Sequence, residues 1–129
     1  MMRLIVTVLV LFMLLLAGCS NSANQQTNSE EPKLKVTLES DPKQIQLNEK
    51  VTFTSKVTYG TENVSEEAKV TFEVIENGVS FGRLPVEPNA DGIYQLDVKF
   101  VEPGEHQVIA HVDYQGLHEM PILSFHLTE

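Results

Sequence analysis

The residues with the clearest capacity for chemistry gather at the C-terminal end of the chain. All four histidines, His106, His111, His118 and His126, fall within residues 106–129, and Met120 stands among them. The other three methionines all lie in the first 13 residues. Imidazole nitrogen and thioether sulfur together suit copper, and the soft sulfur favours Cu(I). These residue types therefore indicate a candidate copper site.

A β-hairpin with Gln115-Gly116 at its tip would bring several of these side chains together. In that register His111 faces Met120, and Asp113 faces His118. Directly opposed residues have Cβ atoms about 5 Å apart, so a ring nitrogen and a thioether sulfur could reach one ion. The alternation of a strand then directs this group away from the apolar face. We expect that apolar face to be the core, formed by Val108, Ala110, Val112, Leu123 and Phe125.

Two interpretations of this histidine–methionine face remain open. In one, His111, His118 and Met120 are copper ligands. In the other, the same side chains form a half-covered sheet face or a contact surface for another protein. His126 has the same strand parity, but six residues at about 3.3 Å each separate it from Met120. We therefore do not expect His126 to join the site.

No pattern of catalytic residues accompanies these side chains. The chain has no phosphate-binding loop, and its single cysteine is Cys19. The carboxylate pairs Glu30-Glu31 and Glu66-Glu67 fit a solvated surface. Nine basic and eighteen acidic side chains give a formal net charge of −9, which argues against nucleic acid and against anionic lipid surfaces. We therefore expect a protein that is not an enzyme.

The N-terminus has the pattern of a secretion signal. Met1-Met2-Arg3 precedes an almost uninterrupted apolar run over residues 4–16, which is too short to cross a bilayer but typical of a signal peptide. Leu16-Ala17-Gly18-Cys19 resembles the bacterial lipobox, in which the cysteine becomes the first residue and carries the lipid. The resemblance implies a signal peptide over residues 1–18. It also implies that acyl chains such as palmitate on Cys19 anchor the protein to the extracytoplasmic face of the cell membrane.

The remaining chain divides into a tether and a folded domain. Residues 20–31 contain no large apolar side chain and cannot offset the entropy of ordering. We therefore predict the lipidated cysteine and a flexible linker over 19–32 and a domain over 33–129. In that domain apolar residues alternate with period two, and turn signals such as Asn77-Gly78 and Pro103-Gly104 recur about every ten residues. The pattern predicts an all-β, immunoglobulin-like antiparallel sandwich.

Two predicted strand starts place a glycine two residues before a ring. Gly92 precedes Tyr94, and Gly104 precedes His106. In the tyrosine corner of immunoglobulin-like sandwiches such a ring bonds the backbone through its polar tip. We therefore predict structural roles for Tyr94 and His106.

The segment from about Val70 to the end of the chain resembles the YtkA-like domain family. The matching features, in order, are Val70–Val74, Asp91–Tyr94, Pro103-Gly104, His111-Val112 and Gly116–Pro121. The resemblance implies a small immunoglobulin-like sandwich on the outer face of the bacterial plasma membrane, with no established biochemical activity. Related domains in other proteins are linked to copper supply for cytochrome oxidase.

The leading hypothesis is a membrane-anchored extracytoplasmic lipoprotein that acts as a non-enzymatic binding module for an envelope protein, a metal ion, or both. One alternative is a copper-binding or copper-delivery lipoprotein that uses His111, His118 and Met120. A second alternative is an accessory domain of a transporter or envelope complex that binds no metal.

Overall fold

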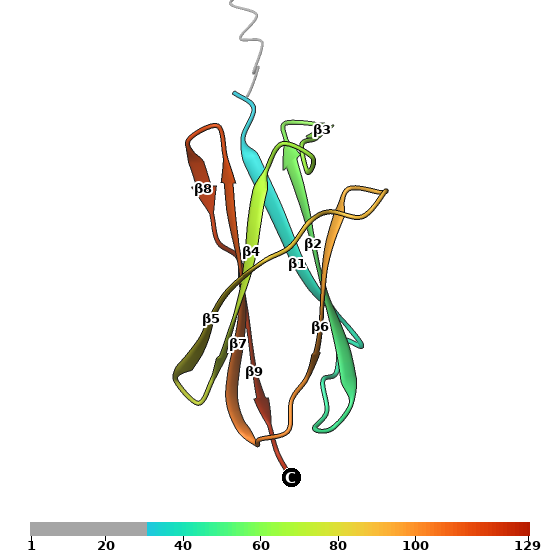
Figure 1. Cartoon of the computed structure of the whole chain (residues 1–129), viewed down its shortest axis with the longest axis vertical. Helices are drawn as coiled ribbons and strands as arrows, with labels where there is room; N and C mark the ends of the chain where they lie inside the picture. Colours follow the sequence, from blue (N-terminus) through green and yellow to red (C-terminus); the bar gives the residue numbers. More distant parts are fainter. Residues whose placement is uncertain (1–30) are drawn as a thin grey trace, which may run out of the picture. The chain divides into compact units, whose positions relative to one another are not determined.

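The described part of the chain consists of β-strands joined by turns and loops (Figure 1). The computed structural model describes residues 31–129; the predicted signal peptide, Cys19 and most of the predicted linker lie outside them. Within residues 31–129 no helix has the length and apolar character needed to span a membrane. The strands are β1 (Leu34–Asp41), β2 (Lys50–Tyr59), β3 (Glu62–Asn63), β4 (Lys69–Glu76), β5 (Val79–Pro85), β6 (Ile93–Lys99), β7 (Gly104–Tyr114), β8 (Leu117–Glu119) and β9 (Ile122–Leu127).

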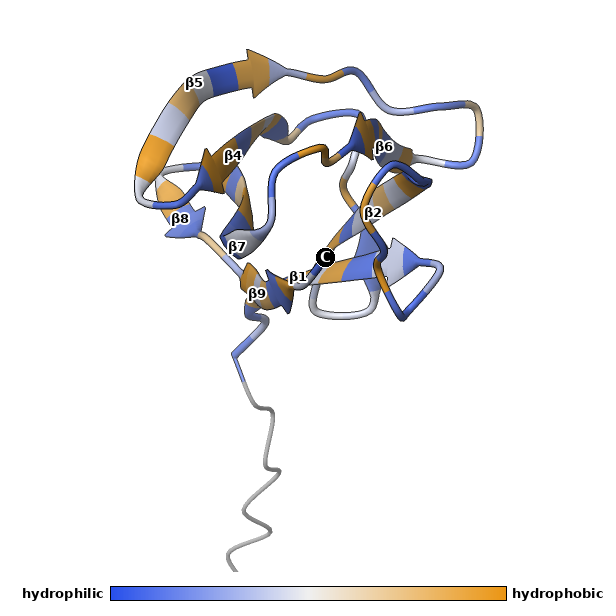
Figure 2. Cartoon of the chain, turned by 90° about the horizontal axis from the view of Figure 1, so that it is seen from below, coloured by the Kyte–Doolittle hydropathy of each residue, from blue (hydrophilic) through white to orange (hydrophobic). Residues whose placement is uncertain are grey.

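These strands form two antiparallel sheets. In the first sheet β2 pairs with β1, β3 and β6, and in the second β4 pairs with β5 while β7 pairs with β4, β8 and β9. Figure 2 looks along the strands and shows β5, β4, β7 and β9 as one layer that faces β6, β2 and β1. The structure confirms the predicted all-β sandwich.

The core lies between the two sheets and follows the predicted alternation. On β7, Val108, Ala110 and Val112 are fully buried. Phe53 of β2 contributes to the core from the opposite sheet, and Phe72 of β4 lies beside Ala110 in the same sheet. Burial of such side chains stabilises the fold by roughly 25 cal/mol per Å² of apolar surface. Residues 31–129 form a compact unit with a core of its own.

His106 belongs to this core. Its ring stacks on Phe125 at a centroid distance of 5.6 Å and lies 4.9 Å from the centroid of Phe100. Its Nε2 lies 2.9 Å from the carbonyl oxygen of Glu102, which can only accept, so Nε2–H donates the hydrogen bond. The side chain is fully buried, which confirms the predicted structural role.

The predicted turns at Asn77-Gly78 and Pro103-Gly104 contact each other and form a joint between two loops. Asn77 and Gly78 both have positive φ, at 49° and 82°, as a tight hairpin turn between β4 and β5 requires. The Asn77 amide donates to the carbonyl of Pro103 at 3.1 Å, and its oxygen accepts from the backbone N–H of Glu105 at 3.0 Å. A Cβ on Gly104 would lie 2.0 Å from that oxygen, so only glycine fits. The joint holds the start of β7 beside the β4–β5 turn.

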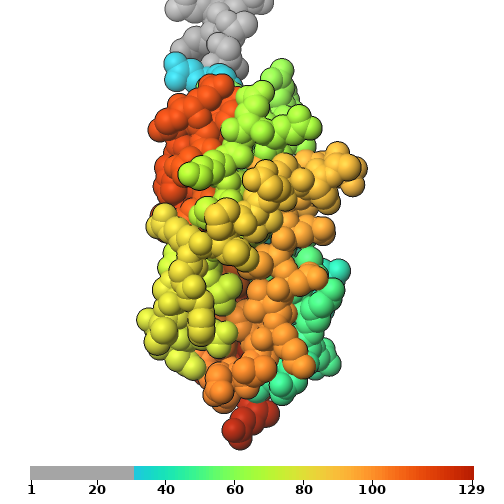
Figure 3. Space-filling model, viewed as in Figure 1, coloured from blue at the N-terminus to red at the C-terminus, as the bar shows by residue number. Residues whose placement is uncertain are grey.

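Strand β5 was missing from the sequence prediction. All seven of its residues are exposed, with Phe81 at 69% of its full accessibility, so it has no buried face to produce a periodic signal. The strand exists because it pairs with β4, and this pairing changes register between Glu73 and Ile75. Figure 3 shows β5, in yellow, on the surface of the domain.

Tyr94 confirms the other predicted structural role. The ring is buried, and its hydroxyl lies within hydrogen-bond reach of the carbonyl oxygens of Ser65 and, at 3.0 Å, Ala68. Burial, together with the charge of Glu87, raises the pKa of Tyr94 above its ordinary value. The contact joins the start of β6 to the loop that precedes β4.

We predict that Tyr94→Phe lowers the free energy of unfolding by about 1–2 kcal/mol, because the buried carbonyl of Ser65 and the partly buried carbonyl of Ala68 lose their donor. Because the folded pKa of Tyr94 is raised, its contribution is complete below about pH 10 and is lost as the pH rises through the folded value. Urea unfolding at neutral and alkaline pH measures both effects. Tyr59→Phe, at a half-exposed ring, is the control. Equal stability of Tyr94→Phe and wild type would contradict the role assigned to the hydroxyl.

Candidate functional site

The candidate site lies on the outer face of the second sheet, where β7 pairs with β4 and β8. The predicted hairpin register is confirmed: Asp113 pairs with His118, and Ile109 pairs with Ile122. Its tip is the predicted Gln115-Gly116, with φ values of 48° and 81°. Met120 lies between β8 and β9, outside the paired residues, and the register continued across this gap sets it opposite His111. Strand parity directs His111 and His118 away from the core, as predicted.

His111 is nonetheless buried. It has the parity of the outer face, opposite to Ala110 and Val112, yet its accessibility is only 3%. The ring centroid of His118 lies 6.1 Å from that of His111, and Glu73 of β4 contacts the ring from the other neighbouring strand. Alternation places a side chain on a face but does not say whether neighbouring side chains cover it.

Glu73 is the site residue that the sequence interpretation missed. Its Oε2 lies 2.7 Å from Nε2 of His111 and 3.7 Å from Nε of Arg83, and its Oε1 accepts from the Ser80 hydroxyl at 2.6 Å. The hydrogen bond from Ser80, followed by that from His111, holds the pKa of Glu73 below its ordinary value. Glu73 is therefore an ionised acceptor fixed from both β5 and β7. The alternation of β4 in the sequence predicts that Glu73 points outward. The sequence did not predict β5, the neighbouring strand that supplies Ser80 and Arg83.

His118 has a carboxylate partner of its own. Its Nδ1 lies 2.7 Å from Oδ1 of Asp113, its direct cross-strand neighbour. Both side chains are well exposed to solvent. Met120 follows two residues later and is 43% exposed. The site thus combines a buried imidazole with an exposed one, and each imidazole bonds a carboxylate.

His126 lies elsewhere, as the sequence analysis expected. It pairs with Glu105 near the start of β7, and its Nδ1 lies 2.7 Å from a carboxylate oxygen of that residue. His126 and Glu105 therefore form the same kind of pair as His118 and Asp113, with the carboxylate again supplied by β7. His126 therefore offers an internal comparison for the candidate site.

A metal ion at this site would need ligands of more than one chemical type. Across residues 31–129, no group of three or more His, Cys, Asp and Glu side chains is placed to hold a metal ion. Any ion bound here would depend on the two imidazoles together with a donor of another type, and the thioether of Met120 is the nearest such group in the register. The chemistry available is therefore that of a soft ion.

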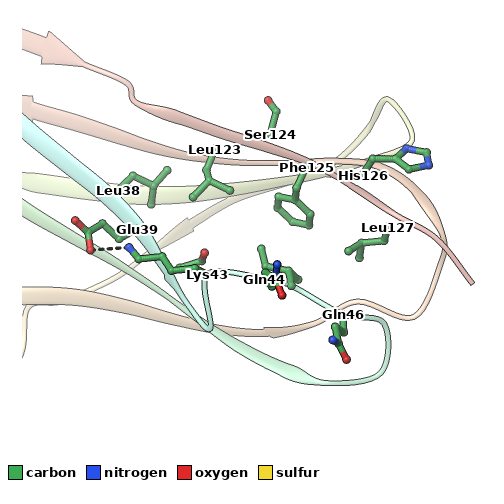
Figure 4. A pocket seen from close by; sticks show the side chains of 12 residues that line it. Leu38, Glu39, Lys43, Gln44, Gln46, Leu123, Ser124, Phe125, His126 and Leu127 are labelled. Carbon is green, nitrogen blue, oxygen red and sulfur yellow. Dashed lines mark hydrogen bonds and ion pairs between the residues drawn. The ribbon is translucent and has the colours of Figure 1, made fainter.

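One hollow in the described part of the chain lies apart from this site. It is an open groove of about 610 Å³ between β1 and β9, where the two sheets leave an edge of the sandwich uncovered (Figure 4). Leu123 and Phe125 point into it, whereas Ser124 and His126 point away. On its rim Glu39 and Lys43 form an exposed ion pair at 3.0 Å.

Comparison with known proteins identifies the family. The family model described as YtkA-like matches residues 28–111, more than half of the chain, and the chain belongs to this family. The match ends at His111, so His118 and Met120 lie beyond the matched residues. A search of curated proteins found no match.

Solved structures with low sequence identity show similar folds. The PmoD soluble domain from Methylocystis sp. is 12% identical, with a TM-score of 0.50 over 74% of this chain and 90% of that one. An endo-β-1,4-mannanase from Thermotoga petrophila is 16% identical, with a TM-score of 0.50 over 81% of this chain and 21% of that one. A conjugative transposon lipoprotein from Bacteroides eggerthii is 12% identical, with a TM-score of 0.44 over 78% of this chain and all of that one. At these identities the first two likenesses concern the fold alone.

We predict that Glu73→Gln lowers the free energy of unfolding by about 1 kcal/mol at pH 7, because charge-assisted bonds to Ser80 and His111 become neutral ones. A lowered folded pKa means that the carboxylate stabilises the fold above the ordinary range of Glu. This contribution is lost as the pH falls through the folded value. The difference between variant and wild type should therefore shrink towards pH 3 in thermal unfolding.

Glu39→Gln is the matched control, since its ion pair with Lys43 is exposed and such pairs contribute little. A difference between Glu73→Gln and wild type that stayed constant from pH 7 to pH 3 would contradict an ionised Glu73.

Proposed function

We propose that the protein is a lipid-anchored, extracytoplasmic, non-enzymatic binding module that binds copper through the outer face of β7 and β8. The lipobox and the polar tether of the sequence support the anchor, and the YtkA-like domain supports the extracytoplasmic location. The hairpin that places His118 beside His111, with Met120 two residues beyond His118, supports the binding role.

The observation that carries the copper proposal is the spacing of the two imidazoles. A ring nitrogen binds a metal at about 2 Å, so two rings that share an ion in near-linear geometry have centroids about 6 Å apart. The centroids of His111 and His118 are 6.1 Å apart. Cu(I) accepts few ligands of low charge, and the thioether of Met120 on the same face adds a soft one.

A protein-binding face without metal is the alternative that a specific observation favours. Met120 and Ile122 are exposed on the same outer face, with Ile122 at 52%. Exposed apolar side chains beside a polar network also fit a contact surface for another envelope protein, as an accessory domain of a transporter or complex would need. The two functions differ in whether removing the thioether and one imidazole abolishes copper binding.

We predict that the mature chain with Cys19→Ser binds one Cu(I) at low-micromolar or tighter affinity, and that His118→Ala/Met120→Leu weakens this binding at least 100-fold. Both changes fall on exposed side chains, so the fold should persist. Competition against a chromogenic Cu(I) chelator measures the affinity. The Cys19→Ser change removes a thiol that would itself bind Cu(I).

His126→Ala is the matched control, because His126 is an exposed histidine with the same kind of carboxylate partner. Unchanged Cu(I) affinity in the double variant would exclude this face as the copper site. In that case co-purification of the protein with a membrane complex would favour the protein-binding alternative.

We also predict that Cys19→Ala releases the protein from the membrane fraction, because no acyl chain can then be attached. Detergent phase partitioning and labelling with radioactive palmitate should both lose their signal. Ser20→Ala, which leaves the cysteine in place, should keep both. Retention of Cys19→Ala with the membrane fraction and in the detergent phase would contradict the lipid anchor.

A further inference from the structure

We infer that Glu73 and Asp113 determine which nitrogens of the two histidines bind the metal: Nδ1 of His111 and Nε2 of His118. This inference rests on the proposed copper function and adds two positioning residues to it. Neither carboxylate is itself a ligand in this arrangement.

The first step is the position of the ring protons. A carboxylate only accepts hydrogen bonds, so the ring nitrogen that bonds it must carry the proton. Glu73 bonds Nε2 of His111 at 2.7 Å, and Asp113 bonds Nδ1 of His118 at 2.7 Å. A neutral imidazole carries one proton, so each ring presents its lone pair on the opposite nitrogen. The two histidines therefore adopt opposite tautomers.

The second step concerns the nitrogen that remains on His111. Its Nδ1 is buried and has no hydrogen-bond partner within the part of the chain that the structure describes. A buried acceptor without a donor is destabilising. An ion bound at Nδ1 would supply the missing interaction. The ring of His118 is 6.1 Å away between centroids and belongs to an exposed side chain that can adjust.

The third step is that the carboxylate of Glu73 is held independently of the histidine. Ser80 donates to its other oxygen at 2.6 Å, and Nε of Arg83 lies 3.7 Å from the oxygen that His111 contacts. Both residues belong to β5, whereas His111 belongs to β7. In metal sites, a ligating histidine usually donates the N–H of its other ring nitrogen to a carboxylate or a backbone carbonyl, and this bond fixes the orientation of the ring.

The resulting ligand set is neutral: two imidazoles and one thioether. A neutral, partly soft ligand set favours Cu(I) over Zn²⁺, which binds well to thiolate and carboxylate ligands. The two carboxylates bond the far nitrogens of the rings and are not ligands themselves, so Glu73 and Asp113 are positioning residues.

The test uses the mature chain, residues 19–129, with Cys19→Ser. Long-range ¹H–¹⁵N correlation NMR of the metal-free protein reads the tautomer of each histidine. Addition of Ag(I), a soft monovalent ion like Cu(I), identifies the bound nitrogens through direct silver–nitrogen coupling. We expect protons on Nε2 of His111 and Nδ1 of His118 in the free protein. We expect coupling at Nδ1 of His111 and Nε2 of His118 after addition.

Two variants test the positioning role. Glu73→Gln can donate through its amide and so permits the other tautomer of His111, and Asp113→Asn does the same for exposed His118. Each should weaken Cu(I) binding 10- to 100-fold. Glu105→Gln, which changes the carboxylate beside His126, should leave Cu(I) affinity unchanged. Asp113 is exposed, so its variant remains informative even if Glu73→Gln impairs folding.

The outcomes separate this inference from the proposed function. Silver coupling at the opposite nitrogens, or an unchanged Cu(I) affinity in Asp113→Asn, would overturn the assignment of Glu73 and Asp113 while leaving the copper function intact. Absence of Cu(I) binding by the protein with wild-type His111, His118 and Met120 would overturn the copper function itself.

Discussion

The register of β7 is the constraint on which the rest of the structure depends. This strand is the longest within residues 31–129, and both of its edges are paired, with β4 along one and β8 and β9 along the other. Val108, Ala110 and Val112 must face the opposite sheet, and the period of two then sends Ile109, His111 and Asp113 outward. A slip of one residue would exchange the two sets and place an imidazole and a carboxylate in the apolar core.

Local features at both ends hold that register in place. At one end, the two positive φ angles of Gln115 and Gly116 close a two-residue turn that permits little variation in pairing. At the other end, Asn77 bonds the backbone on both sides of Gly104, next to His106 in the aromatic cluster. A tight turn at one end and the Asn77 contacts at the other therefore fix the register of β7.

The part of the structure that could be predicted from sequence is the part that local chemistry determines. Alternation gives the sandwich, and a two-residue turn gives the pairing of Asp113 with His118. Glu73 and His111 are 38 residues apart in sequence, and their contact depends on β4 lying beside β7. No local sequence pattern predicts that β4 is the strand next to β7. Strand β5 escaped prediction for a related reason, since its exposed residues carry no burial period and only the β4 edge defines it.

A comparison between His106 and His111 shows why the outer face calls for more than a packing explanation. Both rings are buried, and both leave Nδ1 without a hydrogen-bond partner within residues 31–129, so that feature does not separate them. His106 bonds a backbone carbonyl and stacks on Phe125, which a neutral ring does at little electrostatic cost. His111 instead bonds a carboxylate that two residues of β5 also hold. A charged group on a sheet face loses solvation that an apolar side chain would not lose. Packed apolar side chains in place of both His111 and Glu73 would cost the fold little stability, so the pair is better explained by what Nδ1 of His111 can bind.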